Sequence, residues 1–188
     1  MSEGMRTTVT IPAFNADATL RQAVESALAQ TVEALEVLVV DDGSRTPAVE
    51  ILADLRDERL RILRHDRNRG LSAARNTALA AVRTPLLSQL DADDAWDAGY
   101  LEAVGPCFED PDVGVTYTDA RVIRADGTIE PYLTSGDAHP IDSFPELARR
   151  NPIAALTATL RTDAVRSVGG YARWLWGCFL YTSPSPRD

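Results

Sequence analysis

Short apolar runs alternate with amphipathic segments along the first half of the chain. Four runs have the length and apolar character of buried strands: residues 8–11, 35–40, 60–63 and 85–90. After each run comes a stretch with the residue spacing of an amphipathic helix: residues 18–28, 47–55, 71–82 and 98–108. This alternation predicts βαβ units, and therefore an α/β fold with a mostly parallel central sheet and helices on both faces.

The pattern changes after Pro111. Residues 113–118 and 157–161 have the composition of further strands. Two short segments, 121–123 and 128–130, predict a hairpin around Asp126-Gly127, because Asp-Gly suits a tight turn. A last helix is expected over residues 143–150, with Ser143 as its cap and Glu146 at the capping-box spacing.

The composition limits the domain count and the kinds of partner. A chain of 188 residues with 45% hydrophobic content can form one sizeable core, so a single α/β domain is expected. The net charge of -9 argues against a nucleic-acid-binding surface, which needs clustered Lys and Arg. Cys107 and Cys178 lack a C-x-x-C spacing, so no disulfide framework or zinc site is expected and a reducing cytosol fits best. Residues 1–6 enter the first strand without a long apolar region, so no signal peptide or membrane span is expected there.

Three carboxylates follow the fourth apolar run directly, at Asp91, Asp93 and Asp94. The carboxyl end of a parallel strand is where α/β folds place ligands. Three neighbouring acids repel one another, so the cluster predicts a hard divalent cation, Mg²⁺ or Mn²⁺, of the kind that usually carries a phosphate. The alternative is that Asp93 or Asp94 caps a helix beginning near Trp96, which would explain one carboxylate but not three.

Two other strand ends carry candidate ligand-binding groups. Pro12 to Asn15 would offer backbone groups and an aromatic side chain, Phe14, to a nucleobase. Asp41 or Asp42 could accept hydrogen bonds from a base N–H or a ribose hydroxyl, and Asp42 is preferred for the base. Asp-Asp-Gly-Ser is equally a good turn and helix entry, and this alternative stays open.

A basic side chain is expected on the same side of the sheet. Arg75 lies about one helical turn beyond Ser72, and its guanidinium fork suits a base edge or a diphosphate. The alternative is an arginine that faces solvent from a helix.

Four segments of the chain together resemble the family 2 glycosyltransferases of the GT-A fold, over roughly residues 6–176. They are VTIPAFN at 9–15, VLVVDDGS at 37–44, NRGLSAARN at 68–76 and LDADD at 90–94. The resemblance implies a nucleotide-diphosphate sugar donor, most often a uridine derivative, and a divalent metal, Mn²⁺ or Mg²⁺. It also implies inverting transfer of the sugar to a hydroxyl of an acceptor that the sequence does not identify: a glycan, a lipid or a protein.

The resemblance assigns roles to individual residues of this sequence. The donor-binding residues it implies are Pro12, Phe14, Asn15, Asp41, Asp42, Arg75, Asp91 and Ala92. The metal ligands it implies are Asp93 and Asp91. Asp94 is expected to support these ligands or to cap a helix, and Trp96 to form a wall or a recognition surface of the sugar pocket. His65 and His139 have no partner spacing for catalysis and are predicted to be structural.

The chain departs from the family pattern after Val168-Gly169-Gly170-Tyr171, which resembles the glycine pair before the acceptor-side loop. The family's acidic segment with the catalytic base is absent there, so the base is unknown; Asp119 and Asp137 are candidates that fit turns equally well. The last nine residues resemble a translated transposon adapter from sequencing libraries, and their two Ser-Pro steps disfavour regular structure. We therefore predict an incomplete GT-A domain over 1–179 and a non-native, disordered tail over 180–188.

Two rival functions stay open at this point. A nucleotidyltransferase also holds Mg²⁺ with carboxylates at strand ends, but it favours a Gly-rich phosphate loop, which residues 12–15 do not form. A binding module without transfer activity would keep nucleotide-sugar recognition alone. The expected location is the cytoplasm, with peripheral association at the inner face of the membrane through a missing C-terminal region.

Overall fold

The computed structural model describes residues 6–32, 36–132, 145, 149 and 153–172. Its first half alternates strands and helices: β1 (Thr7–Ala13), α1 (Leu20–Leu28), β2 (Glu36–Asp41), α2 (Ala48–Ile51), β3 (Leu60–Arg64), α3 (Leu71–Ala81), β4 (Leu86–Gln89) and α4 (Tyr100–Val104). The second half contains short elements: η2 (Gly105–Glu109), β5 (Val115–Tyr117), β6 (Arg121–Ile123), β7 (Ile129–Pro131), η3 (Ala155–Thr157), β8 (Ala158–Arg161) and α6 (Thr162–Ser167).

The central sheet has the strand order β3-β2-β1-β4-β8-β5. β1 pairs in parallel with β2 and β4, and β2 pairs in parallel with β3. β8 runs antiparallel to both β4 and β5. The predicted mostly parallel sheet is therefore confirmed, with an antiparallel pair added at one edge.

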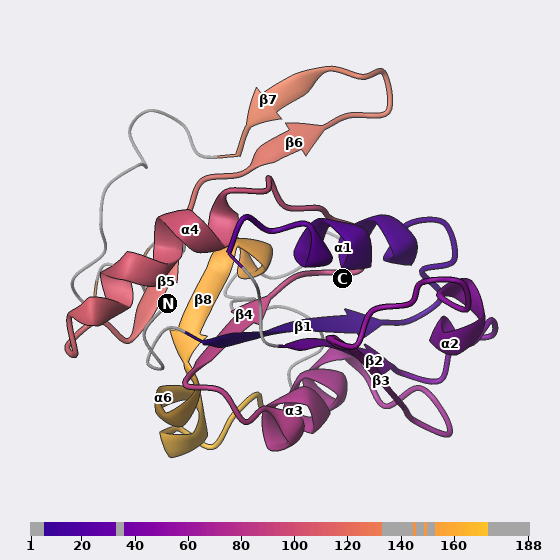
Figure 1. Ribbon diagram of the computed structural model, residues 1–188, viewed down its shortest axis with the longest axis horizontal. Coiled ribbons are helices and arrows are strands. Elements are labelled where there is room, and N and C mark those ends of the chain that lie inside the picture. Colours follow the sequence, from indigo (N-terminus) through magenta and orange to yellow (C-terminus); the bar gives the residue numbers. More distant parts are fainter. Residues whose placement is uncertain (1–5, 33–35, 133–144, 146–148, 150–152, 173–188) are drawn as a thin grey trace.

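Helices cover both faces of this sheet, as predicted: α1 and α4 lie on one side, and α3 and α6 on the other (Figure 1). The alternation of β2 shows why both faces are apolar. Val37 and Val39 belong to the core cluster under α1 and α4. Leu38 and Val40 point the other way and pack with two alanines of α3, Ala74 and Ala78.

Two predicted helices are shorter in the structure, for local reasons. α2 spans four residues instead of 47–55: beyond it the amides of Ala53 and Leu55 bond three residues back, as in turns, and the Ile51 carbonyl accepts a hydrogen bond of 2.9 Å from the Arg21 guanidinium. α4 ends at Val104 and continues as the 3₁₀ segment η2, which has Pro106 in its first turn. Proline lacks the N–H that would continue an α-helix.

The predicted hairpin is confirmed as the separate two-stranded sheet β6–β7, which projects from the main body in Figure 1. The helix predicted over 143–150 lies outside the described residues except for Pro145 and Arg149, and the tail at 180–188, Asp137, His139 and Cys178 also lie outside them. Among the described residues, no helix has the length and apolar character needed to cross a bilayer.

Candidate functional site

Three strands deliver polar residues to one edge of the sheet. In the parallel register, Ala13 at the end of β1 lies beside Asp41 at the end of β2, and Thr10 lies beside Gln89 at the end of β4. The segments that follow these strands therefore emerge together, as the sequence predicted. This edge is the place where open α/β sheets bind ligands.

The loop after β1 is tied to the loop after β2. Asn15 has a positive φ of 51°, which Asn tolerates better than most residues. Its backbone N–H donates to the Ser44 hydroxyl over 3.0 Å, and its side-chain oxygen accepts from the Arg45 amide over 2.9 Å. Phe14 is 49% exposed at the same turn and Pro12 is half-buried. Of the three donor-binding residues predicted here, Phe14 and Asn15 are exposed, and the Asn15 side-chain oxygen is already bonded.

Asp41 anchors the segment that leads into α2. Its carboxylate is 1% exposed and accepts hydrogen bonds from the amides of Ser44, at 2.8 Å, and Ala48, at 3.0 Å. The Arg64 guanidinium donates a third bond of 3.1 Å. Burial by itself would raise the pKa of Asp41, but the amides and the guanidinium outweigh it and the pKa is lowered.

This lowered pKa predicts a pH-dependent contribution to stability. A carboxyl group with a depressed folded-state pKa stabilises the fold above its unfolded pKa, about 3.9, and loses that contribution as the pH falls. We expect Asp41→Asn to reduce the free energy of unfolding by about 1–3 kcal/mol at pH 7 and by less at pH 4. Urea denaturation at both pH values measures this, with Asp112→Asn at an exposed turn as the control. A loss of equal size at both pH values would contradict it.

Asp42 anchors the loop that leads into α3. It is 3% exposed; its Oδ1 accepts from the Arg69 amide at 2.9 Å and lies 2.6 Å from His65 Nδ1, while Oδ2 accepts from the Gly70 amide at 2.8 Å. His65 also bonds through Nε2 to the Thr77 hydroxyl, so this buried histidine is held at both ring nitrogens. Because a carboxylate offers about four acceptor positions, roughly one is left on Asp42 for a ligand. Its contact with a base stays a prediction.

Arg75 and Asp91 form an ion pair under the same edge of the sheet. Arg75 lies on α3, is 7% exposed and donates from one terminal nitrogen to Asp91 Oδ1 over 2.9 Å. Its guanidinium also lies 5.9 Å from the centre of the Tyr171 ring. Its buried Nε has no hydrogen-bond partner among the described residues. The alternative of a solvent-facing arginine is therefore wrong.

The acidic loop after β4 concentrates negative charge. Ala92 is buried, Asp93 is exposed and Asp94 is half-buried. Burial, and then the charges of Asp93 and Asp91, raise the pKa of Asp94 to about 6. No Asp side chain caps the helix that follows, because α4 begins at Tyr100 with Gly99 at its N-cap. The capping alternative for Asp93 and Asp94 is therefore wrong.

The family described as Glycosyl transferase family 2 matches residues 8–161. The chain belongs to this family. No curated protein sequence matches it, whereas solved structures do.

The solved structures share the fold at low sequence identity. TarS 1–349 from S. aureus superposes with a TM-score of 0.71 at 18% identity, covering 92% of this chain and 52% of TarS. Mannosyltransferase PcManGT from Pyrobaculum calidifontis, in complex with GDP-Man and Mn²⁺, superposes with a TM-score of 0.68 at 20% identity. The match covers 90% of this chain and 48% of the PcManGT chain. The fold is GT-A, and this family 2 domain spans about half the length of the structures it matches.

A contact that the sequence analysis missed joins α3 to the segment that follows α6. Asn76 Nδ2 donates to the Tyr171 carbonyl over 2.7 Å, and Asn76 Oδ1 accepts from the Tyr171 amide over 2.8 Å. Gly170, with a φ of 75°, packs so tightly that an added Cβ would lie 2.6 Å from Asn76 Oδ1. Both segments were noticed in the sequence, but no spacing signal connects positions 95 residues apart.

We expect Asn76→Ala to release this contact. Loss of two partly buried hydrogen bonds should cost about 1–3 kcal/mol of unfolding free energy and accelerate hydrogen exchange at the Tyr171 amide. Asn68→Ala is the matched control, since the hydrogen bond that Asn68 Oδ1 accepts from the Gly70 amide lies in an exposed turn. Unchanged exchange at Tyr171 in Asn76→Ala would show that the contact does not hold this segment.

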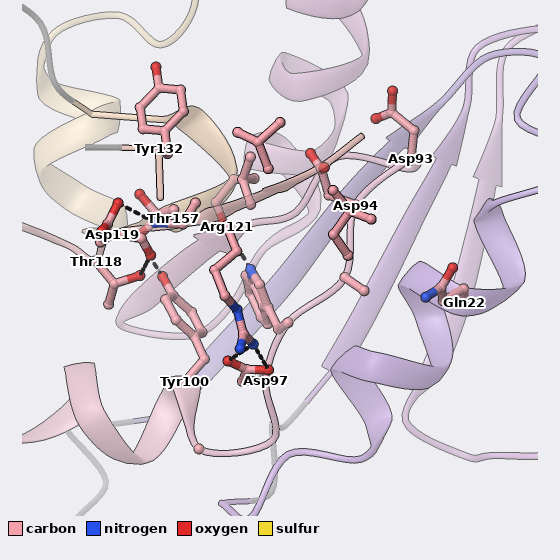
Figure 2. Close-up of a pocket in the computed structure, with 17 residues that line it drawn as sticks. Gln22, Asp93, Asp94, Asp97, Tyr100, Thr118, Asp119, Arg121, Tyr132 and Thr157 are labelled. Carbon is pink, nitrogen blue, oxygen red and sulfur yellow. Dashed lines mark hydrogen bonds and ion pairs between the residues drawn. The ribbon is translucent and has the colours of Figure 1, made fainter. Parts of the chain in front are cut away.

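A cavity of about 1010 Å³ opens beside the acidic loop, between α1, α4, η3 and the β6–β7 hairpin. Figure 2 shows the side chains around it, with Asp93 and Asp94 on one side and Asp119 on the other. Trp96 lines it at 9% exposure, with its indole N–H bonded to the Leu156 carbonyl. The sequence analysis named these residues separately but missed Arg121 and Tyr132, because the hairpin's position is set by the fold.

Proposed function

We propose that this domain binds a nucleotide-diphosphate sugar, with a UDP-sugar as the first choice, and supports metal-dependent, inverting transfer of the sugar to an acceptor hydroxyl. The observation that carries the proposal is the buried Arg75, which pairs with Asp91 at the sheet edge where the acidic loop begins. A buried guanidinium with an unbonded Nε suits an anionic or base-edge ligand better than a purely structural role.

The acidic loop fits a divalent cation in its chemistry. Carboxylate oxygens are the ligands that Mg²⁺ and Mn²⁺ prefer, and the raised pKa of Asp94 reflects burial together with uncompensated negative charge. Asp93 and Asp91 are the ligands we propose. A cation bound there would neutralise charge developing on the departing diphosphate.

The residues of the chain would have distinct tasks around that ligand. Phe14 would offer a stacking surface to the base, and Asp41 and Asp42 would hold the loops that shape the base pocket. Arg75 would orient Asp91 and meet the base edge or the diphosphate. We assign no catalytic base. Asp119 lies in the cavity wall and Asp137 lies outside the described residues.

The complexes of the structural neighbours agree with this class of ligand. TarS 1–349 has been solved with UDP and with UDP-GlcNAc, and PcManGT with GDP-Man and Mn²⁺. These complexes favour a glycosyltransferase that uses a nucleotide-sugar donor over the nucleotidyltransferase alternative. Experiment must decide which nucleobase the donor carries.

Calorimetric titration of the full chain with UDP, GDP, CDP and dTDP, with and without Mn²⁺, tests the proposal. We expect one nucleotide to bind best and to require Mn²⁺. Arg75→Lys keeps the positive charge but loses the planar guanidinium that can donate two parallel hydrogen bonds. It should weaken nucleotide binding by roughly 10- to 100-fold. Arg83→Lys, at an exposed position just beyond the C-terminal end of α3, is the matched control. A folded chain that binds none of the four nucleotides would overturn the proposal.

A further inference from the structure

His65 is a buried histidine directly after β3. It is 7% exposed, and its backbone N–H donates to the Asp41 carbonyl over 2.8 Å, which ties it to the end of β2. Its ring has two polar partners: Nδ1 lies 2.6 Å from Asp42 Oδ1, and Nε2 lies 2.8 Å from the hydroxyl of Thr77 on α3. The ring therefore connects a carboxylate at the end of β2 to a helix on one face of the sheet.

The chemistry of the two partners fixes the direction of both hydrogen bonds. A carboxylate only accepts, so Nδ1 carries the hydrogen and donates to Asp42. In the neutral ring Nε2 then keeps its lone pair, and the Thr77 hydroxyl donates to it. Within the described part of the chain, none of the three side chains has a buried polar atom without a partner. The network is closed, as expected for a side chain that holds another in one orientation.

The ring also decides which acceptor position of Asp42 stays open. Oδ1 receives both the His65 ring and the Arg69 amide, whereas Oδ2 receives the Gly70 amide at 2.8 Å. Because each carboxylate oxygen has about two acceptor positions, the open one lies on Oδ2. Loss of the ring would free a second position and let the carboxylate turn.

Asp42 is connected to α3 at two points. Its direct bond goes to Gly70, the N-cap residue of the helix, and its indirect connection runs through His65 to Thr77. Arg75 lies on α3 between these two points. The orientation of the Asp42 carboxylate and the placement of the Arg75 helix relative to it therefore depend on the same imidazole ring.

We propose that His65 is a positioning residue for nucleotide binding, which keeps the open oxygen of Asp42 aimed at the base and the Arg75 helix fixed beside it. The inference rests on the proposed function, which assigns the base and diphosphate to this edge of the sheet, and deepens it by naming the side chain that orients the site. Both ring nitrogens of His65 are bonded within the protein, so the ring acts through Asp42 and not by touching the ligand.

Two amide substitutions separate positioning from packing. Asn places its N–H₂ group where histidine has Nδ1, so His65→Asn keeps the donor to Asp42. Gln reaches the Nε2 position instead, so His65→Gln keeps an acceptor for Thr77 and loses that donor. We expect His65→Gln to weaken nucleotide binding roughly tenfold and His65→Asn by less than about threefold. A packing role predicts the opposite order, because Gln is closer to His in volume.

Calorimetric titration of the full chain in Mn²⁺ measures both variants, with whichever of UDP, GDP, CDP and dTDP binds the wild-type chain best. Thr77→Val removes the second partner of the ring and should weaken the same nucleotide by about threefold. Thr116→Val is its matched control. Thr116 is half-buried on β5, at the opposite edge of the sheet, and its hydroxyl has no hydrogen-bond partner among the described residues.

Two measurements follow the network without any ligand. Nitrogen-15 NMR of the imidazole rings should find the hydrogen of His65 on Nδ1; the chain has two histidines, so comparison with His65→Gln assigns the signals. Hydrogen exchange reports the Arg69 amide, which donates to the same Asp42 oxygen as the ring. We expect this amide to exchange roughly tenfold faster in His65→Gln and at an unchanged rate in His65→Asn.

These results separate the inference from the proposed function. If a nucleotide binds but His65→Asn loses as much affinity as His65→Gln, the positioning role is overturned and the proposed function stands. If the wild-type chain binds none of the four nucleotides, the proposed function fails, and the ligand-free measurements decide whether His65 orients Asp42. A hydrogen on Nε2 in place of Nδ1, or unchanged exchange at Arg69 in His65→Gln, overturns that orientation.

Discussion

Replacing Gly43 with alanine is expected to destabilise the domain by about 2–5 kcal/mol. Gly43 has a φ of 74°, and an added Cβ would lie 2.5 Å from the Arg67 carbonyl carbon and 2.7 Å from the Asn68 nitrogen. These are backbone atoms of the loop that Asp42 holds, so they cannot move aside as a flexible side chain would. The left-handed conformation costs about 1–2 kcal/mol and the overlap about 1–3 kcal/mol more. Together they remove a large part of the 5–15 kcal/mol typical of a whole domain.

Gly127→Ala separates the two parts of this cost. Gly127 has a similar φ of 83°, but apart from its chain neighbours no atom of the described residues lies within 4 Å of its added Cβ. We therefore expect Gly127→Ala to lower the free energy of unfolding by at most about 1–2 kcal/mol. Urea denaturation measures this loss, and the yield of soluble Gly43→Ala protein is measured alongside. If the two variants lost the same free energy of unfolding, the claim that residues 67–68 crowd the added Cβ at Gly43 would be wrong.

The sequence was sufficient to predict the parallel part of the fold. The buried β2 is a nearly continuous apolar run, and apolar strand segments alternate with helical segments along this part of the chain. Right-handed βαβ crossovers then bring the strand ends to one edge, which is why residues such as Asp42 and Asp91 could be expected to meet.

Contacts between distant segments were beyond such a prediction. The short β8 has a strand pattern, but nothing in the pattern tells that it pairs antiparallel with β4, more than 70 residues earlier in the chain. The Ile51 carbonyl at the end of α2 is bonded by Arg21 from another helix, and the Tyr171 backbone is bonded by Asn76. Local propensity is overridden in each case by a partner that only the folded chain supplies.

The candidate site was predicted in its composition more than in its contacts. The sequence placed Asp41 and Asp42 at a strand end, and the structure adds that each carboxylate already accepts bonds from two backbone amides. Both interpretations of Asp-Asp-Gly-Ser, a turn and a ligand-binding loop, therefore remain compatible. The turn is observed, and it shapes the surface to which we assign the base.

The acidic loop leads to our last prediction, that Mn²⁺ and nucleotide bind cooperatively. The described residues contain no group of three or more His, Cys, Asp or Glu side chains that could hold a metal. Two carboxylates, Asp91 and Asp93, leave most positions of a six-coordinate cation to be filled by water or phosphate oxygens. We therefore expect UDP to raise the affinity for Mn²⁺ by roughly 10- to 100-fold, and Mn²⁺ to raise the affinity for UDP by the same factor.

The loss of the free-Mn²⁺ signal in electron paramagnetic resonance measures this coupling, with the association of Mn²⁺ and UDP in buffer determined separately. Asp93→Ala should abolish the coupling and leave the metal-free affinity for UDP unchanged, because Asp93 is exposed and its removal leaves no buried group unpaired. Asp112→Ala, an exposed carboxylate at a distant turn, should keep it. Tight Mn²⁺ binding without UDP would mean that the protein supplies a complete ligand set by itself. Because reciprocity is a thermodynamic requirement, unequal coupling factors would indicate a second metal site rather than a failure of the first.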